Sequence, residues 1–420
     1  MGRVYRWERE QEGPGRARLF IEVAPLRNLV PVRDGQPRLA GRFVTVRNAS
    51  VLSRSGPDDI VRAVPLGNAV PDALGRFLFD PGRGGGRIDK VRLPAEDFRL
   101  RYIQASRFGE VNVYFHVDRI AGYVDALLGE LAAPSLPPAI VVVNAHHAAV
   151  EEPEGRDGRR CPDGRHVPFQ GGHYRLPGPT TRIPEKHEVA ATGEIHLGPG
   201  QKLSAEGSLA RIVGGGYRVN ASHNAGIIYH EYGHHISRHT ADFRGNATRL
   251  PHLQSNRKAG LDEGFADYWT AVMLGTPDIW FFHHRHDDAV IHRRSLRSRK
   301  TMVDYRRGAG SDPHSNGTIW AAALWQLRTS ACQADLNAGS NAGRTIDRLV
   351  LGAMLLLGRN PRPVDRRSFA TAALALRDAD ATFNAGRWQD LIARTLASRG
   401  LDTDGASSRS RDRPTDRASC

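Results

Sequence analysis

The chain has 420 residues, a formal net charge of +14 and an isoelectric point near 10.2. Its hydrophobic residues amount to 40% and its charged residues to 25%, values typical of globular proteins that exclude wholesale disorder and fibrous architectures. The length allows two or three domains. The strong positive charge raises the hypothesis that the protein binds a nucleic acid or another acidic surface.

The first part of the chain, up to about residue 105, alternates short apolar runs with Gly, Pro and Asp clusters. This pattern is typical of strands joined by turns and predicts strands at 18–25, 41–48 and 76–81. A Gly-rich run at 82–87 lacks the Gly-Lys-Ser/Thr ending of a phosphate-binding loop, so we interpret it as a turn. This region is therefore expected to be rich in strands.

A helix with one apolar stripe is predicted for 111–131 because its apolar side chains recur every three or four residues. The run 139–149 indicates a buried strand, and 193–198 indicates another. Between them, 151–187 is rich in Gly, Pro, Arg and His without periodicity. We expect that stretch to be a long surface excursion.

Beyond residue 224 the apolar pattern becomes helical throughout. The predicted helices are 224–239, 260–274, 316–330, 344–357, 364–379 and 386–398. The tail from Asp402 to Cys420 has no apolar periodicity and is predicted to be disordered. The longest apolar run, 349–357, is too short for a membrane span, and the first nine residues hold no apolar signal-peptide core.

The most informative motif is His230-Glu231-Tyr232-Gly233-His234. Residues i and i+4 of a helix point in nearly the same direction, so His230 and His234 can hold one metal ion. Glu231 can then face a water molecule beside that ion. The sequence therefore predicts a catalytic zinc site of the HExxH type.

A catalytic zinc ion needs a third protein ligand. The metzincin pattern requires Gly and His at positions that hold Ser237 and Thr240 here, so that pattern is excluded. The alternative is a Glu on a second helix, and Glu263 with Asp267 provides an i, i+4 carboxylate pair among aromatic residues. We expect Glu263 to bind the metal and Asp267 to accept the N–H of a ligand imidazole.

These residues resemble the gluzincin metallopeptidases, particularly the thermolysin and fungalysin types, whose motif is HExxH followed by an E-x-x-x-D helix. Softer similarities extend the resemblance over about 110–385. They are the helix beginning at Asn112, the helix 317–325, and Asn360-Pro361 followed by the segment from Ser368 to Asp380. Fungalysin-type enzymes usually carry Thr-His-Gly where this chain has Gly233-His234-His235.

The resemblance implies an α+β fold of the thermolysin type with two lobes, a β-rich N-terminal lobe and an all-helical C-terminal lobe, with the zinc site between them. The corresponding divisions are 1–105, a β-rich prosegment remnant or accessory domain; 106–225, the N-terminal lobe; 226–400, the helical lobe; and 401–420, the tail. It implies one Zn²⁺ on His230, His234 and Glu263. Structural Ca²⁺ also occurs in thermolysin-type enzymes, but no ligand cluster in the sequence supports it.

The resemblance also implies a zinc-dependent endopeptidase acting on peptide or protein substrates. Glu231 would accept the proton of the attacking water, and His314, before a later helix, would assist the developing oxyanion. A Tyr also contributes in that family, and the choice between Tyr268, Tyr305 and others stays open. Asn144 and Ala145, which end a predicted strand, are the candidates for an edge that binds the substrate backbone.

Two other functions stay open: a binding or scaffold protein of metallopeptidase fold with a basic surface for anionic partners, and a zinc hydrolase of a non-peptide substrate. The stretch 283–307 is the most basic, but it carries no nucleic-acid-binding signature, so we interpret it as a solvated insert. Relatives of the resembled type are typically secreted, although no export signal is found here. Whether Cys161 and Cys332 pair is also left open.

Overall fold

A computed structural model describes most of the chain. The described residues are 1–9, 17–30, 39–49, 51–55, 60–64, 68–81, 95–148, 166–168, 171–176, 189–198, 201–204, 211–214, 220–241, 256–279, 294–307, 311–335, 341–361 and 368–401. The Gly-rich run 82–87 and the tail 402–420 lie outside them, as do Cys161 and Cys420. Cys332 is a free thiol.

The sheet nearest the helices has four strands. They are β3 (Val44–Asn48), β6 (Ala139–Val143), β10 (Glu194–Leu197) and β9 (Gly172–Arg175). Their order is β3-β6-β10-β9; β6 runs parallel to both β3 and β10, whereas β9 pairs antiparallel with β10 at one edge. The apolar run of β6 is buried, as expected for a central strand.

Other described strands form two strand pairs and a second four-stranded sheet. They are the hairpin of β1 (Gly2–Arg9) and β2 (Ala17–Ala24), the pair β7 (His146–Ala148) and β8 (His166–Pro168), and a sheet in the order β12 (Arg211–Gly214), β11 (Gln201–Ser204), β4 (Val51–Ser55), β5 (Ile60–Val64). The strand predicted at 76–81 is wrong. Phe77 forms an isolated bridge to Gly2 at the start of β1. A tight turn at 72–75 comes just before Phe77, so the pairing with β1 does not extend further.

The longest helix, α1 (Ala95–Glu130), begins sixteen residues before the predicted 111–131. The division expected between residues 105 and 106 therefore lies inside a continuous helix. Side chains of β1 and β3 share one hydrophobic core with α1, including Val4, Val44 and Val117. The N-terminal strands thus pack on the same core as the rest of the chain.

The remaining helices agree closely with the predicted periodicity. They are α2 (Ala225–His239), α4 (Asn256–Leu274), α6 (Pro313–Ala334), α7 (Ala342–Arg359), α8 (Phe369–Asn384) and α9 (Gln389–Ala397). Side-chain caps fix several of their first turns, for example Asn224 before α2 and Ser368 before α8.

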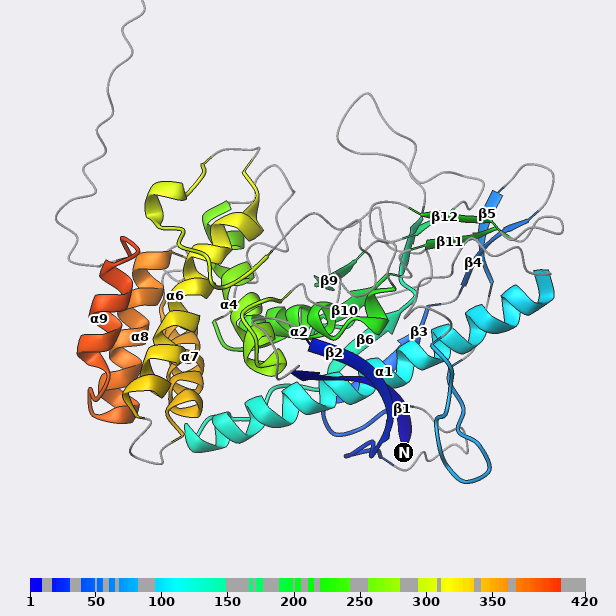
Figure 1. The fold of residues 1–420 in the computed structure, drawn as a ribbon, viewed down its shortest axis with the longest axis horizontal. Helices are drawn as coiled ribbons and strands as arrows, with labels where there is room; N and C mark the ends of the chain where they lie inside the picture. The colour runs from blue at the N-terminus through cyan, green and yellow to red at the C-terminus, as the bar shows by residue number, and fades with distance from the viewer. Residues whose placement is uncertain are drawn as a thin grey trace, which may run out of the picture.

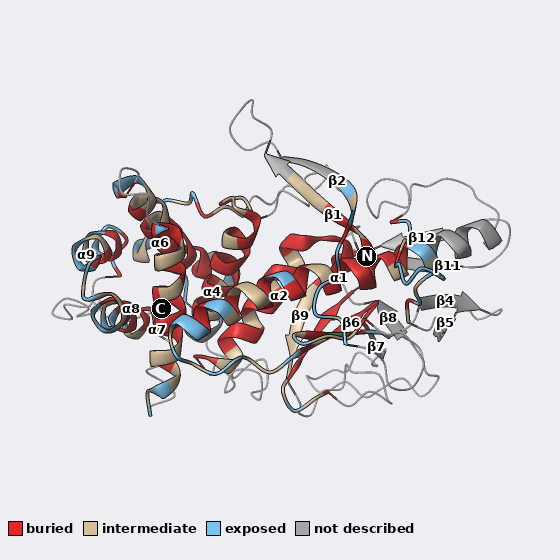
Figure 2. Ribbon diagram, turned by 90° about the horizontal axis from the view of Figure 1, so that it is seen from below, coloured by how far each residue is buried: buried red, intermediate tan, exposed pale blue. Residues whose placement is uncertain are grey.

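Figure 1 shows how these elements are arranged. The strands lie on one side of the molecule, helices α6 to α9 lie on the other, and α2 and α4 lie between them, with α1 running along both parts. In Figure 2 buried residues are found in the sheet containing β6 and in α1, α2, α4, α6 and α7. The fold is therefore mixed α/β, with α1 and α2 packed on the sheet and α4 packed between α2 and α6.

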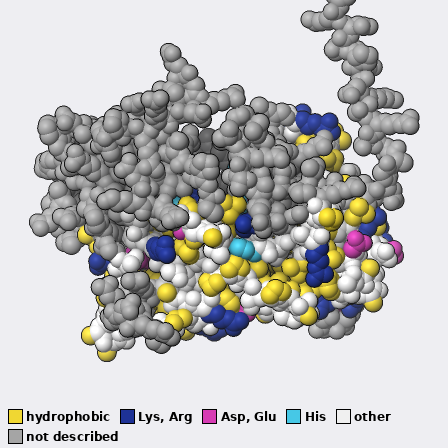
Figure 3. All heavy atoms as spheres, turned by 180° about the vertical axis from the view of Figure 1, so that it is seen from behind, with side chains coloured by type: hydrophobic (Ala, Val, Ile, Leu, Met, Phe, Trp, Pro, Cys, Tyr) yellow, Lys and Arg dark blue, Asp and Glu magenta, His cyan; other side chains and the backbone are white. Residues whose placement is uncertain are grey.

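The structure also bears on the positive charge. On the described part of the face in Figure 3, Lys and Arg side chains lie in separate groups, with hydrophobic side chains between them. Such a distribution does not form the continuous basic stripe typical of a nucleic-acid-binding surface. None of the helices in the described part of the chain combines the length and apolarity that crossing a membrane requires.

Candidate metal centre

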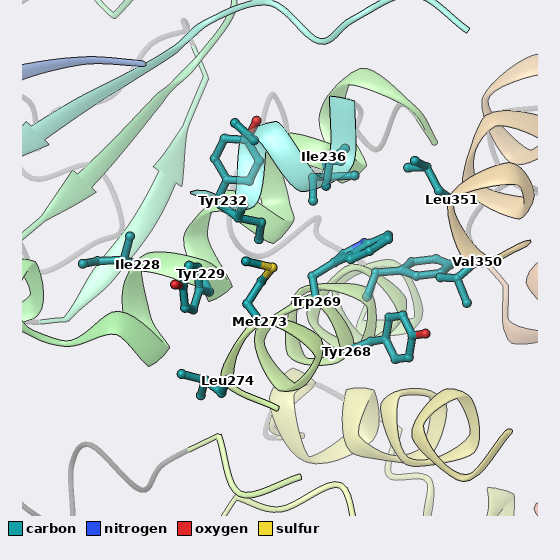
Figure 4. Packing of buried hydrophobic residues seen from close by; sticks show 14 of the residues in the cluster. Ile228, Tyr229, Tyr232, Ile236, Tyr268, Trp269, Met273, Leu274, Val350 and Leu351 are labelled. Carbon is teal, nitrogen blue, oxygen red and sulfur yellow. The ribbon is translucent and has the colours of Figure 1, made fainter. Parts of the chain in front are cut away.

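Helix α2 carries the HExxH motif between the sheet and α4. Asn224 caps its first turn by accepting a hydrogen bond from the N–H of Ile227. One face of the helix is apolar and buried, and Figure 4 shows Ile236 near Trp269 of α4 and Tyr229 near Met273 of the same helix. This apolar anchoring leaves the opposite face, with both motif imidazoles, turned toward polar partners.

Glycines let the three site helices approach closely. A Cβ placed on Gly233 of α2 would lie 2.5 Å from Cα of Ala266 in α4. A Cβ on Gly317 of α6 would lie 2.9 Å from Cβ of Glu263 and 2.7 Å from the backbone oxygen of Gly260. Because larger residues would force the helices apart, these glycines allow side chains from α2, α4 and α6 to meet at Glu263.

Both motif imidazoles lie beside the carboxylate of Glu263. Nε2 of His230 is 3.0 Å from Oε2 of Glu263, and Nε2 of His234 is 3.8 Å from Oε1. The two imidazole rings have centroids 4.9 Å apart. Three potential ligand side chains from α2 and α4 therefore converge on a small volume.

Each imidazole also contacts a second carboxylate through its other nitrogen. Nδ1 of His230 lies 2.9 Å from Oδ1 of Asp267, and Nδ1 of His234 lies 3.0 Å from Oδ2 of Asp262. Burial works against protonation of both imidazoles, but the carboxylates outweigh it and raise the pKa of His230 to about 9 and that of His234 to about 10. The surroundings therefore favour positive charge at this point.

Arg294 completes the buried charge cluster. Its Nε donates to Oδ2 of Asp267 at 2.7 Å, and its Nη2 donates to Oε2 of Glu263 at 3.3 Å. The prediction that 283–307 is a solvated insert is therefore wrong for Arg294, which is largely buried against α4. Residues 283–293 lie outside the described part of the chain.

His314 reaches the same carboxylate from the first turn of α6. Its Nε2 lies 3.3 Å from Oε2 of Glu263, and its Nδ1 lies 2.9 Å from Oδ1 of Asp312. Asp312 also caps α6, because its side chain accepts from the N–H groups of His314 and Ser315. The hydrogen bond to His314 is the largest cause that lowers the pKa of Asp312, to about 2.

Glu231 is buried at the side of this cluster. Its Oε2 is fully shielded from solvent and makes no hydrogen bond within the described structure. Burial raises its pKa, although the imidazoles of His230 and His234 act in the opposite direction. Gly172 of edge strand β9 lies directly against it, since a Cβ there would be 2.6 Å from Cγ of Glu231.

The structure does not bring Asn144 and Ala145 to a sheet edge. They follow β6, which lies between β3 and β10, and both are buried. Asn144 donates to the side chains of Asn48 and Ser106, whereas the N–H of Ala145 donates to the backbone oxygen of Leu197. The sheet edge next to the candidate site is β9 instead.

Tyr268 likewise lies away from the cluster. It is fully buried, and its hydroxyl donates to Oδ1 of Asp347 in α7 at 2.5 Å. Tyr123 and Arg328 bind the same carboxylate. Tyr268 is therefore a structural link between helices rather than a group that faces the candidate ligands.

Within the described residues, one group of side chains could hold a metal ion with ligand atoms all within 4.8 Å of one another. It consists of His230, Glu263 and His314. His234 lies at its border, 3.8 Å from Glu263. The set of imidazole and carboxylate donors suits zinc, and the acidic partners of the imidazoles are those that zinc-binding histidines commonly have.

The sequence of this part of the chain matches that of a known family. A sequence model of the fungalysin metallopeptidases matches residues 215–405, a segment that includes α2, α4 and α6. This segment, a little under half of the chain, is similar to the fungalysin metallopeptidases. The resemblance inferred from the HExxH and E-x-x-x-D helices is thereby confirmed.

Individual relatives share 25–29% of their aligned residues with this chain. The chain is similar to an extracellular metalloproteinase of Fusarium vanettenii, with 29% identity over 208 residues, which cover 44% of this chain and 31% of that protein. It is also similar to extracellular metalloproteinases of Aspergillus terreus, with 27% identity, and of Trichophyton tonsurans, with 25% identity. These matches cover 43% and 42% of this chain, and 31% and 30% of those proteins. The chain thus spans about a third of the length of the curated relatives it matches.

Proposed function

We propose that the chain is a zinc-dependent endopeptidase. The observation that carries this proposal is the meeting of His230, His234 and Glu263 from two helices, with Glu231 buried beside them. The match of residues 215–405 to the fungalysin metallopeptidases supports the same reaction class. The proposed substrates are peptides or proteins.

The proposed ligands of a single Zn²⁺ are His230, His234 and Glu263, and Asp267 and Asp262 would orient the two imidazoles. Oε2 of Glu231 is buried and has no hydrogen-bond partner within the described structure. Because a buried carboxylate oxygen rarely lacks a partner, we expect a water molecule or another polar group to bind here. A zinc ion at this position would supply Lewis-acid polarisation of the scissile carbonyl and of the attacking water. No ligand cluster among the described residues supports structural Ca²⁺.

The proton transfers are assigned to the chain's own residues. Glu231 accepts a proton from the attacking water and passes it to the leaving amine, because its buried carboxylate lies beside the proposed ligands and burial raises its pKa. His314 donates a hydrogen bond to the developing oxyanion, with its ring oriented by Asp312. Exposure of 46% of the His314 side chain leaves it accessible to a substrate.

The substrate backbone is proposed to add alongside β9. Edge strands offer unpaired N–H and C=O groups to an extended peptide. Gly172 of β9 is close enough to Glu231 that a peptide on this edge would pass the proposed base. This assignment replaces Asn144 and Ala145 as the candidate substrate edge.

The proposed organisation is that of two lobes, with the strands and α1 on one side, α6 to α9 on the other, and the zinc site between them. The strands before α1 would then be either a remnant of an inhibitory prosegment or an accessory unit. Relatives are called extracellular, which supports secretion of this chain as a further proposal. A scaffold without catalysis and a hydrolase of non-peptide substrates are not favoured, because the family that matches residues 215–405 is one of peptidases.

The test is a comparison of wild type with Glu231→Gln. Zinc content is measured by elemental analysis, and casein cleavage is measured with and without a chelator. We expect about one zinc per chain in both proteins, with cleavage lost in the variant and in chelated wild type. Glu22→Gln, half-buried on β2 beside Arg6, is the matched control and should cleave normally. Absence of zinc, or unchanged cleavage by Glu231→Gln, would refute the proposal.

A further inference from the structure

A hollow lies beside residues 296–299, which follow Arg294 in the chain. It has a volume of about 510 Å³ and lies between residues 296–299, the middle of α6 and Arg399, which follows α9. This volume is within the range of small-molecule sites. Nine residues line the hollow, and they include three arginines but no Asp or Glu.

Arg399 is the most unusual of these residues. It is only 7% exposed, yet all its hydrogen-bond acceptors within the described structure are neutral. Its Nη1 donates to the backbone oxygens of Ser298 and Lys300, both at 2.9 Å, and its Nε and Nη2 donate to Oε1 of Gln326 at 3.2 and 2.9 Å. A buried cation without a counter-charge is costly, so an anion at this point would stabilise it.

The other residues that line the hollow also favour an anionic ligand. Arg297 and Arg299 line the same hollow and are exposed, and neither forms an ion pair with any residue that the structure describes. Trp325 and Leu296 provide buried apolar surface beside the three guanidinium groups. A ligand that matches both features carries an anionic group next to a flat apolar one.

We propose that this hollow binds a small molecule with a carboxylate or phosphate group attached to an apolar, preferably aromatic, part. The anionic group would lie among Arg297, Arg299 and Arg399, and the apolar part would lie against Trp325. The proposal concerns binding alone and holds whether or not the chain hydrolyses peptides.

The test uses calorimetric titration of the full-length, zinc-loaded Glu231→Gln protein at 0.15 M salt. Phenyl phosphate is the main probe, and benzoate tests a carboxylate in place of the phosphate. Inorganic phosphate carries only the anionic group, and phenol carries only the aromatic part. We expect one binding site for phenyl phosphate or benzoate, weaker binding of inorganic phosphate and no binding of phenol. Because this change removes two charged hydrogen-bond donors, Arg297→Gln/Arg299→Gln should weaken binding about tenfold or more.

The matched control removes two exposed arginines that do not line the hollow, with Arg359→Gln/Arg394→Gln. It should bind the probe as tightly as the parent. Equal weakening by both double variants would mean general charge attraction and would overturn the proposal. Binding that disappears when zinc is removed would place the anion at the metal, and no saturable binding at millimolar probe would also overturn it.

Discussion

Gly172 of β9 lies directly against Glu231 of α2. A Cβ at Gly172 would be 2.6 Å from Cγ and 2.8 Å from Oε1 of Glu231, and 2.8 Å from Cγ2 of Ile227. No side chain can be accommodated at these distances without a shift of the carboxylate or of the strand. This contact connects the sheet edge proposed to bind substrate with the residue proposed to move the proton.

Gly172→Ala is therefore expected to reduce kcat/KM by about 100-fold, because a displacement of about 1 Å at a reacting group can have an effect of that size. Gly129→Ala is the matched control, since a Cβ at Gly129 near the end of α1 meets nothing within 4 Å. The control should keep full activity and gain about 0.5–1 kcal/mol in the free energy of unfolding. Normal peptide cleavage by Gly172→Ala would contradict the close coupling of β9 to Glu231.

The helices of the site could be predicted from the sequence because two independent signals agreed there. The HExxH spacing brings both His side chains to one side only if the segment is a helix. The apolar periodicity around Ile228 and Ile236 predicts a helix over the same residues. The E-x-x-x-D spacing likewise predicted a helix at α4 with Glu263 and Asp267 on one side of it. Such local patterns are sufficient to orient side chains on one helix, although they do not show which helices meet.

Strand β9 and Arg294 could not be found in this way. The four residues of β9 lie in a stretch rich in Gly, Arg and His, and they become a strand only by pairing with β10. Arg294 belongs to a basic stretch whose composition indicates solvent exposure, whereas two carboxylates on α4 bury it. In both cases a tertiary contact determines the local structure, so the periodicity of the local sequence does not predict it.

The roles of His234 and His314 can be separated by measuring zinc affinity and turnover independently. His234 lies on the motif face of α2, with its Nδ1 beside Asp262, whereas His314 is half exposed and held by Asp312. We expect His234→Ala to lose zinc. His314→Ala should keep zinc near one per chain while kcat falls by about 10²–10³, the range seen when an oxyanion donor is removed. Loss of zinc in His314→Ala with retention in His234→Ala would reverse the assignment.

The carboxylates behind the ligands should set metal affinity. Asp267→Asn and Asp262→Asn each leave the imidazole of a proposed ligand without its charged partner, which typically weakens metal binding 10–100-fold. The effect at Asp267 should be the larger, because Arg294 would also lose a buried ion-pair partner. Competition with a chromogenic chelator measures the zinc dissociation constant. Asp378→Asn, an exposed change on α8, should leave that constant unchanged.

Tyr268 is expected to matter for stability and not for turnover. Its hydroxyl donates to buried Asp347, which also accepts from Tyr123 at 2.6 Å. Tyr268→Phe and Tyr123→Phe should therefore each lower the free energy of unfolding by about 1–3 kcal/mol, as expected for a hydrogen bond to a charged group. Both should cleave casein at the wild-type rate under conditions where they are folded. A loss of kcat in Tyr268→Phe alone would instead assign its hydroxyl to the reaction.

Glu110 of α1 gives the fold a pH dependence of its own. It is fully buried, and its carboxylate accepts from the N–H of Ala69 and from Nδ2 of Asn48, both at 2.8 Å. Burial outweighs these hydrogen bonds and raises the pKa of Glu110 from 4.5 to about 7. Between these two pH values the folded protein keeps a proton that the unfolded chain has released.

The contribution of Glu110 to the free energy of unfolding therefore falls as pH rises from 4.5 to 7, by up to about 1.4 kcal/mol per pH unit. Glu110→Gln removes the titration and leaves an offset that does not depend on pH. The stability of the variant relative to wild type, from urea unfolding at each pH, should then rise by about 3 kcal/mol across this window and stay constant above it. A difference that is flat with pH would show that Glu110 ionises in the folded protein as it does in water.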